Sequence, residues 1–211
     1  MNVLSNTLFA LSSAQVITER VSSSWEWYVV RAAGFVAAFL LILLIISGVG
    51  QATGKIFKYI EPTKMWIIHR ALGISLLISI AIHGGFLLFN PYIRFNLIQL
   101  LFPFLNRYSN GTKFLGLPLN GLAVGFGVLS MYIAAILVFT SLGWIEKSPK
   151  RWRKLHYLSY VLVVLVFFHG LYVGSDIRYG IFRDGWIFFG MVVVAAIISR
   201  LWRSGVTKPH E

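Results

Sequence analysis

The stretch M-W-I-I-H-R-A-L-G-I-S-L-L-I-S-I-A-I-H-G-G-F-L-L-F at residues 65–89 decides the fold of this chain. It is longer than the roughly 20 apolar residues that a helix needs to cross a bilayer, yet it carries His69 and His83. A second apolar stretch, L-H-Y-L-S-Y-V-L-V-V-L-V-F-F-H-G-L-Y-V, carries His156 and His169. Because ionisable side chains are costly inside lipid, these four histidines indicate a functional site.

The composition predicts an all-α, integral membrane helical bundle. Of the 211 residues, 57% are hydrophobic and 12% are charged, whereas a soluble domain has about 25% charged residues. We expect a bundle of five transmembrane helices with tryptophan near the ends of the apolar runs, where this side chain prefers the headgroup layer. The expected spans are residues 28–49, 65–89, 119–144, 155–173 and 185–202.

Three segments lie outside these spans. Residues 1–27 are expected to form an N-terminal tail or interfacial helix, because they lack the basic start of a signal peptide. The loop at 90–118 is too short and too interrupted by proline to span, so we expect an interfacial hairpin or short helix there. Residues 204–211 are expected to form a C-terminal tail, which leaves 28–203 as one transmembrane domain.

The basic residues predict the orientation of the bundle. Twelve of the 19 lysines and arginines follow the first, third and fifth spans, and seven lie on the opposite side. Cytoplasmic loops are rich in these residues, so we expect the N-terminus outside and the C-terminus inside. The second and fourth spans then run in the same direction. His69 and His156 fall near the inner face, and His83 and His169 near the outer face.

Two features of the composition exclude other classes of protein. The chain has no cysteine, which excludes disulfides, iron–sulfur clusters, thiolate-ligated haem and covalent c-type haem. The net charge of +12 would also suit a nucleic-acid-binding protein, but basic cytoplasmic loops explain it more simply. We therefore expect a lipid bilayer, and no nucleic acid, as a partner.

The spacing of the histidines predicts on which side of its helix each imidazole lies. Fourteen residues separate His69 from His83, which in a helix is a rise of about 21 Å and a rotation about 40° short of four turns, so both point to nearly the same side. Thirteen residues separate His156 from His169, and this leaves about 140° of mismatch. Either the fourth helix is distorted, or His156 lies in an entering turn after Pro149, or the bound groups approach the helix at different angles.

The number of histidines at each depth favours haem over a bare metal ion. A zinc or copper site needs three or four converging ligands, whereas haem iron needs two axial ligands, and each depth offers two histidines. Met65, Met131 and Met191 are axial ligands in principle, but packing explains them more simply. Two other functions stay open, a non-redox carrier that uses the histidines as a proton or metal relay, and a structural subunit.

Basic side chains and glycines lie near the same depths. Arg31, Arg70 and Arg153 are candidates for cofactor binding, because arginine pairs with carboxylates such as haem propionates. Positive charge on the cytoplasmic side equally explains the latter two. Five glycines could make room for a porphyrin: Gly34, Gly73, Gly121, Gly125 and Gly170. Gly121 and Gly125 suit a contact between helices better.

Several short motifs are similar to those of a known family. They are V-R-A-A-G at 30–34, H-R-A-L-G at 69–73, H-G-G at 83–85, T-S-L at 140–142, W-R-K-L-H-Y-L-S-Y at 152–160 and H-G-L-Y-V-G-S-D at 169–176. Together with the histidine spacings, they resemble the ferric reductase-like transmembrane domain family, which includes the membrane parts of ferric reductases and NADPH oxidases. The resemblance covers most of the chain from about residue 30 to residue 176.

The resemblance implies two b-type haems, one on His69 and His156 and the other on His83 and His169, with Arg31 near the outer haem. Family members that reduce iron or oxygen usually continue into a flavin- and NADPH-binding domain. We expect no FAD or NADP site in this chain, because it has no G-x-G-x-x-G after a strand.

These observations predict a two-haem membrane cytochrome b that carries electrons from the inner to the outer face. A separate flavoprotein reductase or a membrane quinol would be the donor, and the basic run at 147–154 could dock an acidic donor protein. The acceptor on the outer face stays open, and so does the question of whether the chain acts as an enzyme or only as the electron-transfer component of an oxidoreductase. The expected location is a bacterial plasma membrane.

Overall fold

The computed structural model describes residues 25–90, 95–105, 113–114, 117–177 and 179–206. In this part of the chain, five helical segments are long and apolar enough to cross a membrane, so the predicted fold class is confirmed. They are α2 (Trp25–Ala52), α3 (Pro62–Leu87), α5 (Leu119–Gly143), the consecutive helices α6 (Pro149–His156) and α7 (Leu158–Val173), and α8 (Ile181–Val206).

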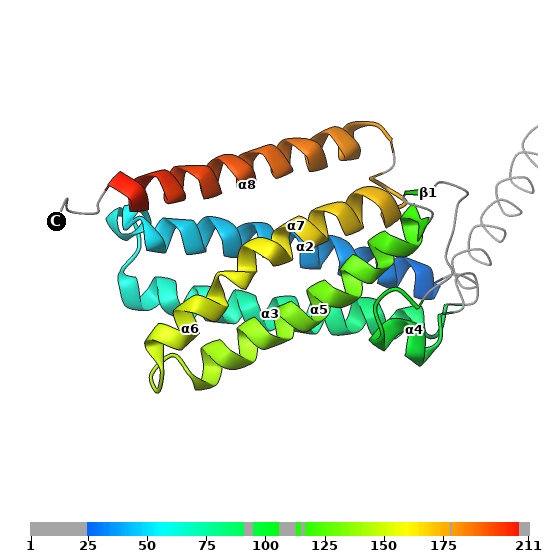
Figure 1. The fold of residues 1–211 in the computed structure, drawn as a ribbon, viewed down its shortest axis with the longest axis horizontal. Coiled ribbons are helices and arrows are strands. Elements are labelled where there is room, and N and C mark those ends of the chain that lie inside the picture. Colours follow the sequence, from blue (N-terminus) through cyan, green and yellow to red (C-terminus); the bar gives the residue numbers. More distant parts are fainter. Residues whose placement is uncertain (1–24, 91–94, 106–112, 115–116, 178, 207–211) are drawn as a thin grey trace, which may run out of the picture.

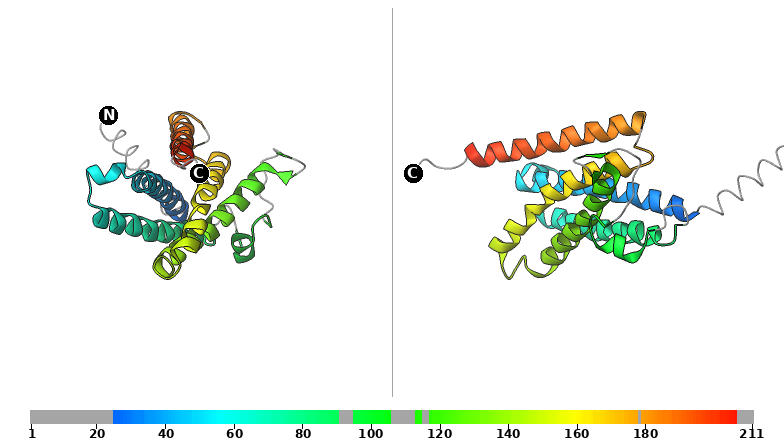
Figure 2. Two further views of the ribbon diagram at one scale, coloured as in Figure 1. Left: turned by 60° about the vertical axis from the view of Figure 1, so that its left-hand side comes forward. Right: turned by 45° about the vertical axis from the view of Figure 1, so that its right-hand side comes forward.

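Consecutive spans run in opposite directions, so α3 and α7 run in the same direction (Figure 1). Helix α2 packs against α3, and α5 packs against α7, as two antiparallel pairs. Helix α8 closes the bundle beside α2 and α7 (Figure 2). The histidine-bearing helix α3 thus lies between α2 and α5, and the other one, α7, lies between α5 and α8.

The fourth span begins earlier than predicted, at Pro149 rather than near residue 155. The basic run that follows is helical, and proline at the first helical position fits because that position needs no intrahelical N–H donor. The fifth span is also longer than predicted, because α8 covers Ile181–Val206. These differences lie at helix ends, where polar residues continue a helix beyond its apolar part.

The connections are short elements. A 3₁₀ helix, η1 (Lys55–Lys58), follows α2. The loop predicted as a hairpin or short helix contains α4 (Leu97–Leu101) and two paired two-residue strands, β1 (Lys113–Phe114) and β2 (Leu117–Pro118). Asn96 caps α4 by accepting a 2.8 Å hydrogen bond from the Gln99 backbone. The predicted N-terminal tail falls almost wholly on residues 1–24, outside the described part of the chain, as does the end of the C-terminal tail.

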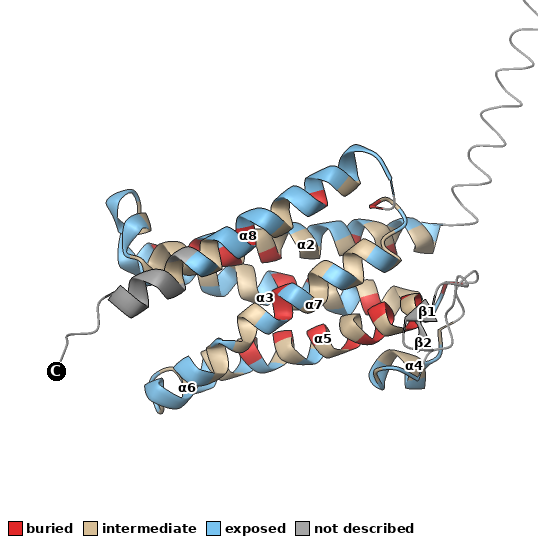
Figure 3. Ribbon diagram, turned by 45° about the horizontal axis from the view of Figure 1, so that its top comes forward, coloured by how far each residue is buried: buried red, intermediate tan, exposed pale blue. Residues whose placement is uncertain are grey.

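One cluster of buried apolar residues forms a layer across the bundle, and other buried residues lie outside it, many of them on α5 (Figure 3). This layer takes side chains from all five spans, and its members are Leu41, Ile45, Leu76, Ala134, Leu137, Leu162, Val163 and Val193. Large apolar side chains point away from it, such as Phe39, Phe139 and Phe188, each at least 60% exposed. Such an apolar outer surface suits lipid and not water.

Candidate functional site

The structure brings the four histidines together as two pairs. The ring centres of His69 and His156, the first pair, are 6.3 Å apart, and those of His83 and His169, the second pair, are also 6.3 Å apart. Two imidazoles that bind one metal from opposite sides, at bonds of about 2.0–2.1 Å, have ring centres roughly 6.3–6.5 Å apart. Each pair therefore has the separation that one iron atom between its rings requires.

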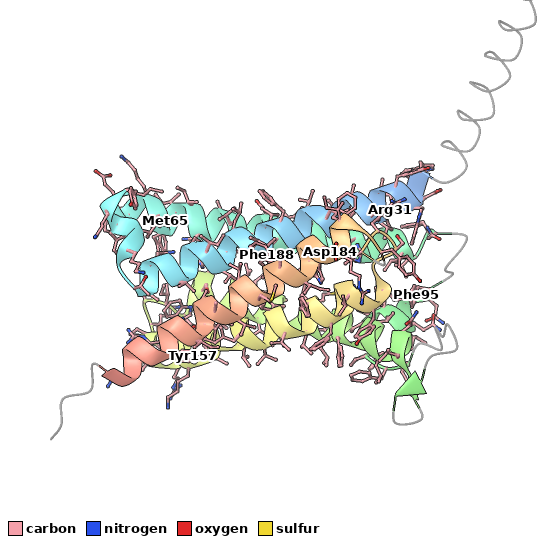
Figure 4. All side chains as sticks on the ribbon, turned by 90° about the horizontal axis from the view of Figure 1, so that it is seen from above. Arg31, Met65, Phe95, Tyr157, Asp184 and Phe188 are labelled. Atoms are coloured by element: carbon pink, nitrogen blue, oxygen red, sulfur yellow. The ribbon has the colours of Figure 1, made fainter. Side chains whose placement is uncertain are left out.

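The two pairs lie toward opposite ends of the bundle. Figure 4 shows Met65 and Tyr157, neighbours of the first pair in the sequence, at one end, and Arg31 and Phe95 at the other. Among the described residues, no group of three or more His, Cys, Asp or Glu side chains could hold a metal ion. Each pair thus offers two nitrogen ligands, which is the number of axial ligands that haem takes.

Backbone carbonyls hold both rings of the second pair. His83 Nδ1 lies 2.8 Å from the Val30 carbonyl oxygen, and His169 Nδ1 lies 2.8 Å from that of Ala123. A carbonyl oxygen only accepts hydrogen bonds, so both Nδ1 atoms carry the proton and both Nε2 atoms keep a free lone pair. This tautomer is the one in which metal-binding histidines are normally held by their surroundings.

A glycine makes room for each ring of this pair. A Cβ atom on Gly34 would lie 3.1 Å from His83 Nδ1, and one on Gly127 would lie 2.6 Å from His169 Nδ1. Each glycine stands four residues after the residue whose carbonyl accepts the hydrogen bond, Val30 for the first and Ala123 for the second. Gly34 was among the glycines that could make room for a porphyrin, whereas Gly127 was not singled out.

The first pair is held differently. His69 Nδ1 lies 2.8 Å from Ser47 Oγ, which was not predicted to belong to the site. His156 is packed against the Trp152 ring, with ring centres 5.0 Å apart, and its Nδ1 is buried without a hydrogen-bond partner among the described residues. Trp152 is itself fixed, because its Nε1 donates a 3.0 Å hydrogen bond to Ser141 Oγ.

A distortion between α6 and α7 brings His156 and His169 to the same side. Tyr157 separates the two helices, and the bonds around it run to the third residue, from Tyr157 N to Lys154 O at 3.3 Å and from Tyr160 N to Tyr157 O at 3.1 Å. Such a 3₁₀-type turn winds by about 120° per residue instead of about 100°. The extra winding reduces the mismatch of the thirteen-residue spacing. The first of the three explanations, a distorted fourth helix, is therefore observed. His156 also lies in the short helix that follows Pro149 and precedes α7.

Each histidine pair opens onto its own cavity. The cavity beside the first pair has a volume of about 560 Å³, and the one beside the second pair has about 240 Å³. Three buried leucines line both cavities and therefore separate them: Leu41, Leu76 and Leu162. The first volume lies within the range of about 300–1,000 Å³ that is usual for ligand sites, and the second lies slightly below it.

The charge of the two cavities differs. Arg70, Arg153 and Arg200 line the first cavity, and none of its described lining residues is acidic. The Arg70 guanidinium lies 5.3 Å from the centre of the Trp66 ring, and that of Arg200 lies over two tyrosine rings and donates to the Tyr160 hydroxyl. The first cavity is thus positively charged and suits an anionic group.

In the second cavity, Arg31 has a carboxylate partner. Its Nε donates a 2.8 Å hydrogen bond to Asp176 Oδ2, and its Nη2 forms a second bond to Oδ1. This ion pair ties α2 to the segment after α7, and it neutralises the arginine. Asp176 and Arg200 were not predicted as site residues, although the sequence offered a signal for the former, because it ends the motif H-G-L-Y-V-G-S-D.

Other predicted residues lie elsewhere in the packing. Gly125, expected at a helix contact, faces the Phe104 ring, and Gly170 faces Trp186. Gly73 is in ordinary contact with Val138, and it lines the first cavity. Met131 lines the second cavity, whereas Met191 is 58% exposed on the outer surface of the bundle. These glycines therefore make room for side chains.

Comparison with known proteins identifies the transmembrane part of the chain. A family model described as the ferric reductase like transmembrane component matches residues 33–167. The match includes His69, His83 and His156, and it ends two residues before His169. No curated protein and no solved structure matches the chain at a significant level.

Proposed function

Because this chain belongs to the family of ferric reductase-like transmembrane components, we propose that it binds two b-type haems and carries electrons across the bilayer between them. Family membership makes it a membrane electron-transfer component that works with a separate donor. The observation that carries the two-haem proposal is the equal separation of the two histidine pairs, with ring centres 6.3 Å apart in each.

The residues of this chain have distinct roles in the proposal. His69 and His156 are the axial ligands at one site, and His83 and His169 are those at the other. When bound, haem supplies one-electron chemistry, because its iron is stable in two oxidation states. The three leucines between the cavities keep the two sites apart.

The charges of the cavities support this assignment. Haem carries two propionates, and arginine binds carboxylates through two parallel hydrogen bonds. The first cavity offers Arg70, Arg153 and Arg200 without an acidic lining residue among those described, so these arginines suit the propionates there. At the second cavity, Arg31 is already paired with Asp176. We assign Arg31 to the outer haem, where a propionate would bind it alongside the Asp176 carboxylate.

The basic residues support the orientation of the bundle in this proposal. The end of the bundle with the first pair carries the exposed basic side chains of α6 and of η1, and such residues mark the cytoplasmic side. We therefore place the first pair inside and the second pair outside, with residues 28–203 as the haem-binding domain. The donor is a flavoprotein or a quinol, an acidic donor protein would dock on α6, and the acceptor lies on the outer face, in a bacterial plasma membrane.

Haem content measured on purified variants tests this proposal. We expect the wild-type protein to show a dithionite-reducible b-type spectrum with two haems per chain. His69→Ala and His83→Ala should each lose one haem and keep the other, because each removes a ligand of only one pair. His210→Ala, which changes the fifth histidine, is the control and should keep both.

Two results would contradict the proposal. A colourless wild-type protein would favour a carrier that uses the histidines as a proton or metal relay. Loss of both haems in each single variant, with the protein still folded by circular dichroism, would show that the two pairs do not form independent sites.

A further inference from the structure

The hydroxyl group of Ser47 has only one hydrogen, and its position decides the state of His69. Ser47 Oγ lies 3.0 Å from the Leu44 carbonyl oxygen, which can only accept, so the hydroxyl donates its hydrogen there. The same Oγ lies 2.8 Å from His69 Nδ1. When the hydroxyl donates to the Leu44 carbonyl, Oγ accepts in this second bond, His69 Nδ1 carries the proton and Nε2 keeps its lone pair.

The surroundings of Ser47 repeat those of the second pair. Gly48 stands four residues after Leu44, as Gly34 stands four residues after Val30. A Cβ atom on Gly48 would lie 3.5 Å from the His69 ring. Leu44 also follows Val30 by fourteen residues, the spacing of the two histidines on α3. Helix α2 thus presents a carbonyl to each histidine of α3, directly at one and through a serine hydroxyl at the other.

From these contacts, we propose that Ser47 is the positioning residue of the first haem site, which fixes the tautomer and the direction of the His69 ring. The inference rests on the proposed function, because it concerns an axial ligand. Ser47 is 4% exposed, so bulk water does not compete for the hydrogen bond. His156, the other ligand, has no hydrogen-bond partner at Nδ1 in the described part of the chain, so Ser47 is the hydrogen-bonding anchor of this pair.

The hydrogen bond has a measurable effect on the iron. An imidazole that donates from its second nitrogen is a more basic ligand, and loss of such a partner typically weakens metal binding or activity about 10- to 100-fold. A weaker donor also stabilises ferric iron less, which raises the midpoint potential. Removing the Ser47 hydroxyl should therefore raise the midpoint potential of one haem and weaken its binding, while the other haem stays unchanged.

The test is a spectroscopic redox titration and a haem-binding measurement on Ser47→Ala, Ser47→Val and Ser47→Thr. The first two remove the hydroxyl and should shift one of the two haems, whereas Ser47→Thr keeps the hydroxyl and should behave as wild type. Ser79→Ala, a serine on α3 that is 8% exposed and lines neither cavity, is the matched control. If Ser47→Ala does not fold, the near-isosteric pair of Ser47→Val and Ser47→Thr decides the question.

Single-haem backgrounds assign the effect to one site. In His83→Ala, the remaining haem is that of the first pair, so Ser47→Ala should shift it; in His69→Ala, the remaining haem should not respond. Equal potentials and haem affinities in Ser47→Ala, Ser47→Val and wild type would overturn the role of Ser47 and leave the two-haem proposal intact. Absence of haem from the wild-type protein would instead reject the proposed function itself.

Discussion

The position of each histidine ring in the second pair depends on a nearby glycine as well as on the hydrogen bond of its Nδ1. Gly127 lets the His169 ring reach the Ala123 carbonyl, because a Cβ atom there would lie 2.6 Å from two ring atoms. Neither the ring nor the backbone carbonyl can move away without breaking the hydrogen bond between them. The function of this glycine is therefore to allow close approach, which no larger residue permits.

Gly127→Ala should reduce the haem content from two haems per chain to one. The added methyl group displaces the His169 ring and should abolish haem binding at the second pair, while the first pair stays loaded. Gly143→Ala, at the end of the same helix and with nothing within 4 Å of the added Cβ atom, should keep both haems. Haem content after purification measures this. Two haems in Gly127→Ala would show that the ring is not confined as described.

At this scale the sequence pointed to the four histidines that the structure pairs more clearly than to the residues that contact them. The four histidines stand out because an ionisable residue in an apolar run is rare. Ser47 and Gly127 do not stand out, because small residues are common in membrane helices for packing alone. Arg200 belongs to the site because α8 folds back over the first cavity, which no local pattern indicates. Asp176 had a local signal, because it ends the motif H-G-L-Y-V-G-S-D.

Among the helices, the fourth span decides whether both pairs form. Its break at Tyr157 reorients α7 relative to α6. As a result, the histidines of this span, thirteen residues apart, both lie opposite those of α3, which are fourteen residues apart. The five spans were predictable because a bilayer fixes the length of an apolar helix. The histidine spacing raised a distortion of the fourth helix as one of three explanations, but its position was not predictable, because W-R-K-L-H-Y-L-S-Y contains neither the glycine nor the proline that usually marks a break.

A one-residue insertion in α7 tests this register. An alanine inserted after Val163 rotates His169 by about 100° and moves it by about 1.5 Å relative to His156. An optical redox titration should then show a single haem, that of the first pair. An alanine inserted between Tyr179 and Gly180, in the turn before α8, leaves α7 intact and should keep two components. A titration with two unchanged components after the α7 insertion would mean that the register of α7 does not matter.

On the scale of the whole molecule, the two ends of the bundle differ in charge. The exposed face of α6 carries Lys150, Arg151, Arg153 and Lys154, next to the cavity of the first pair. The opposite end carries the neutralised Arg31. Counting basic residues along the sequence predicted this asymmetry, because it needs only the order of the spans. The partner that meets each end depends on surfaces outside this chain.

Charge reversal on α6 tests whether it receives the donor. Lys150→Glu with Arg151→Glu should slow haem reduction by an acidic flavoprotein donor about tenfold or more and should weaken its dependence on ionic strength, because steering by opposite charges speeds association by factors of that size. Lys55→Glu with Lys58→Glu, on η1 at the same end, is the control and should have a smaller effect. Stopped-flow reduction at several salt concentrations gives both quantities. Equal rates in the wild type and in both double variants would show that the donor does not bind at α6.

The most direct test of the central claim is the position of iron in an experimental map of the haem-loaded protein. The account predicts one iron atom between the imidazoles of His69 and His156 and another between those of His83 and His169, with Leu41, Leu76 and Leu162 between the two. Iron bound anywhere else, or a map in which the rings of either pair point away from each other, would contradict it.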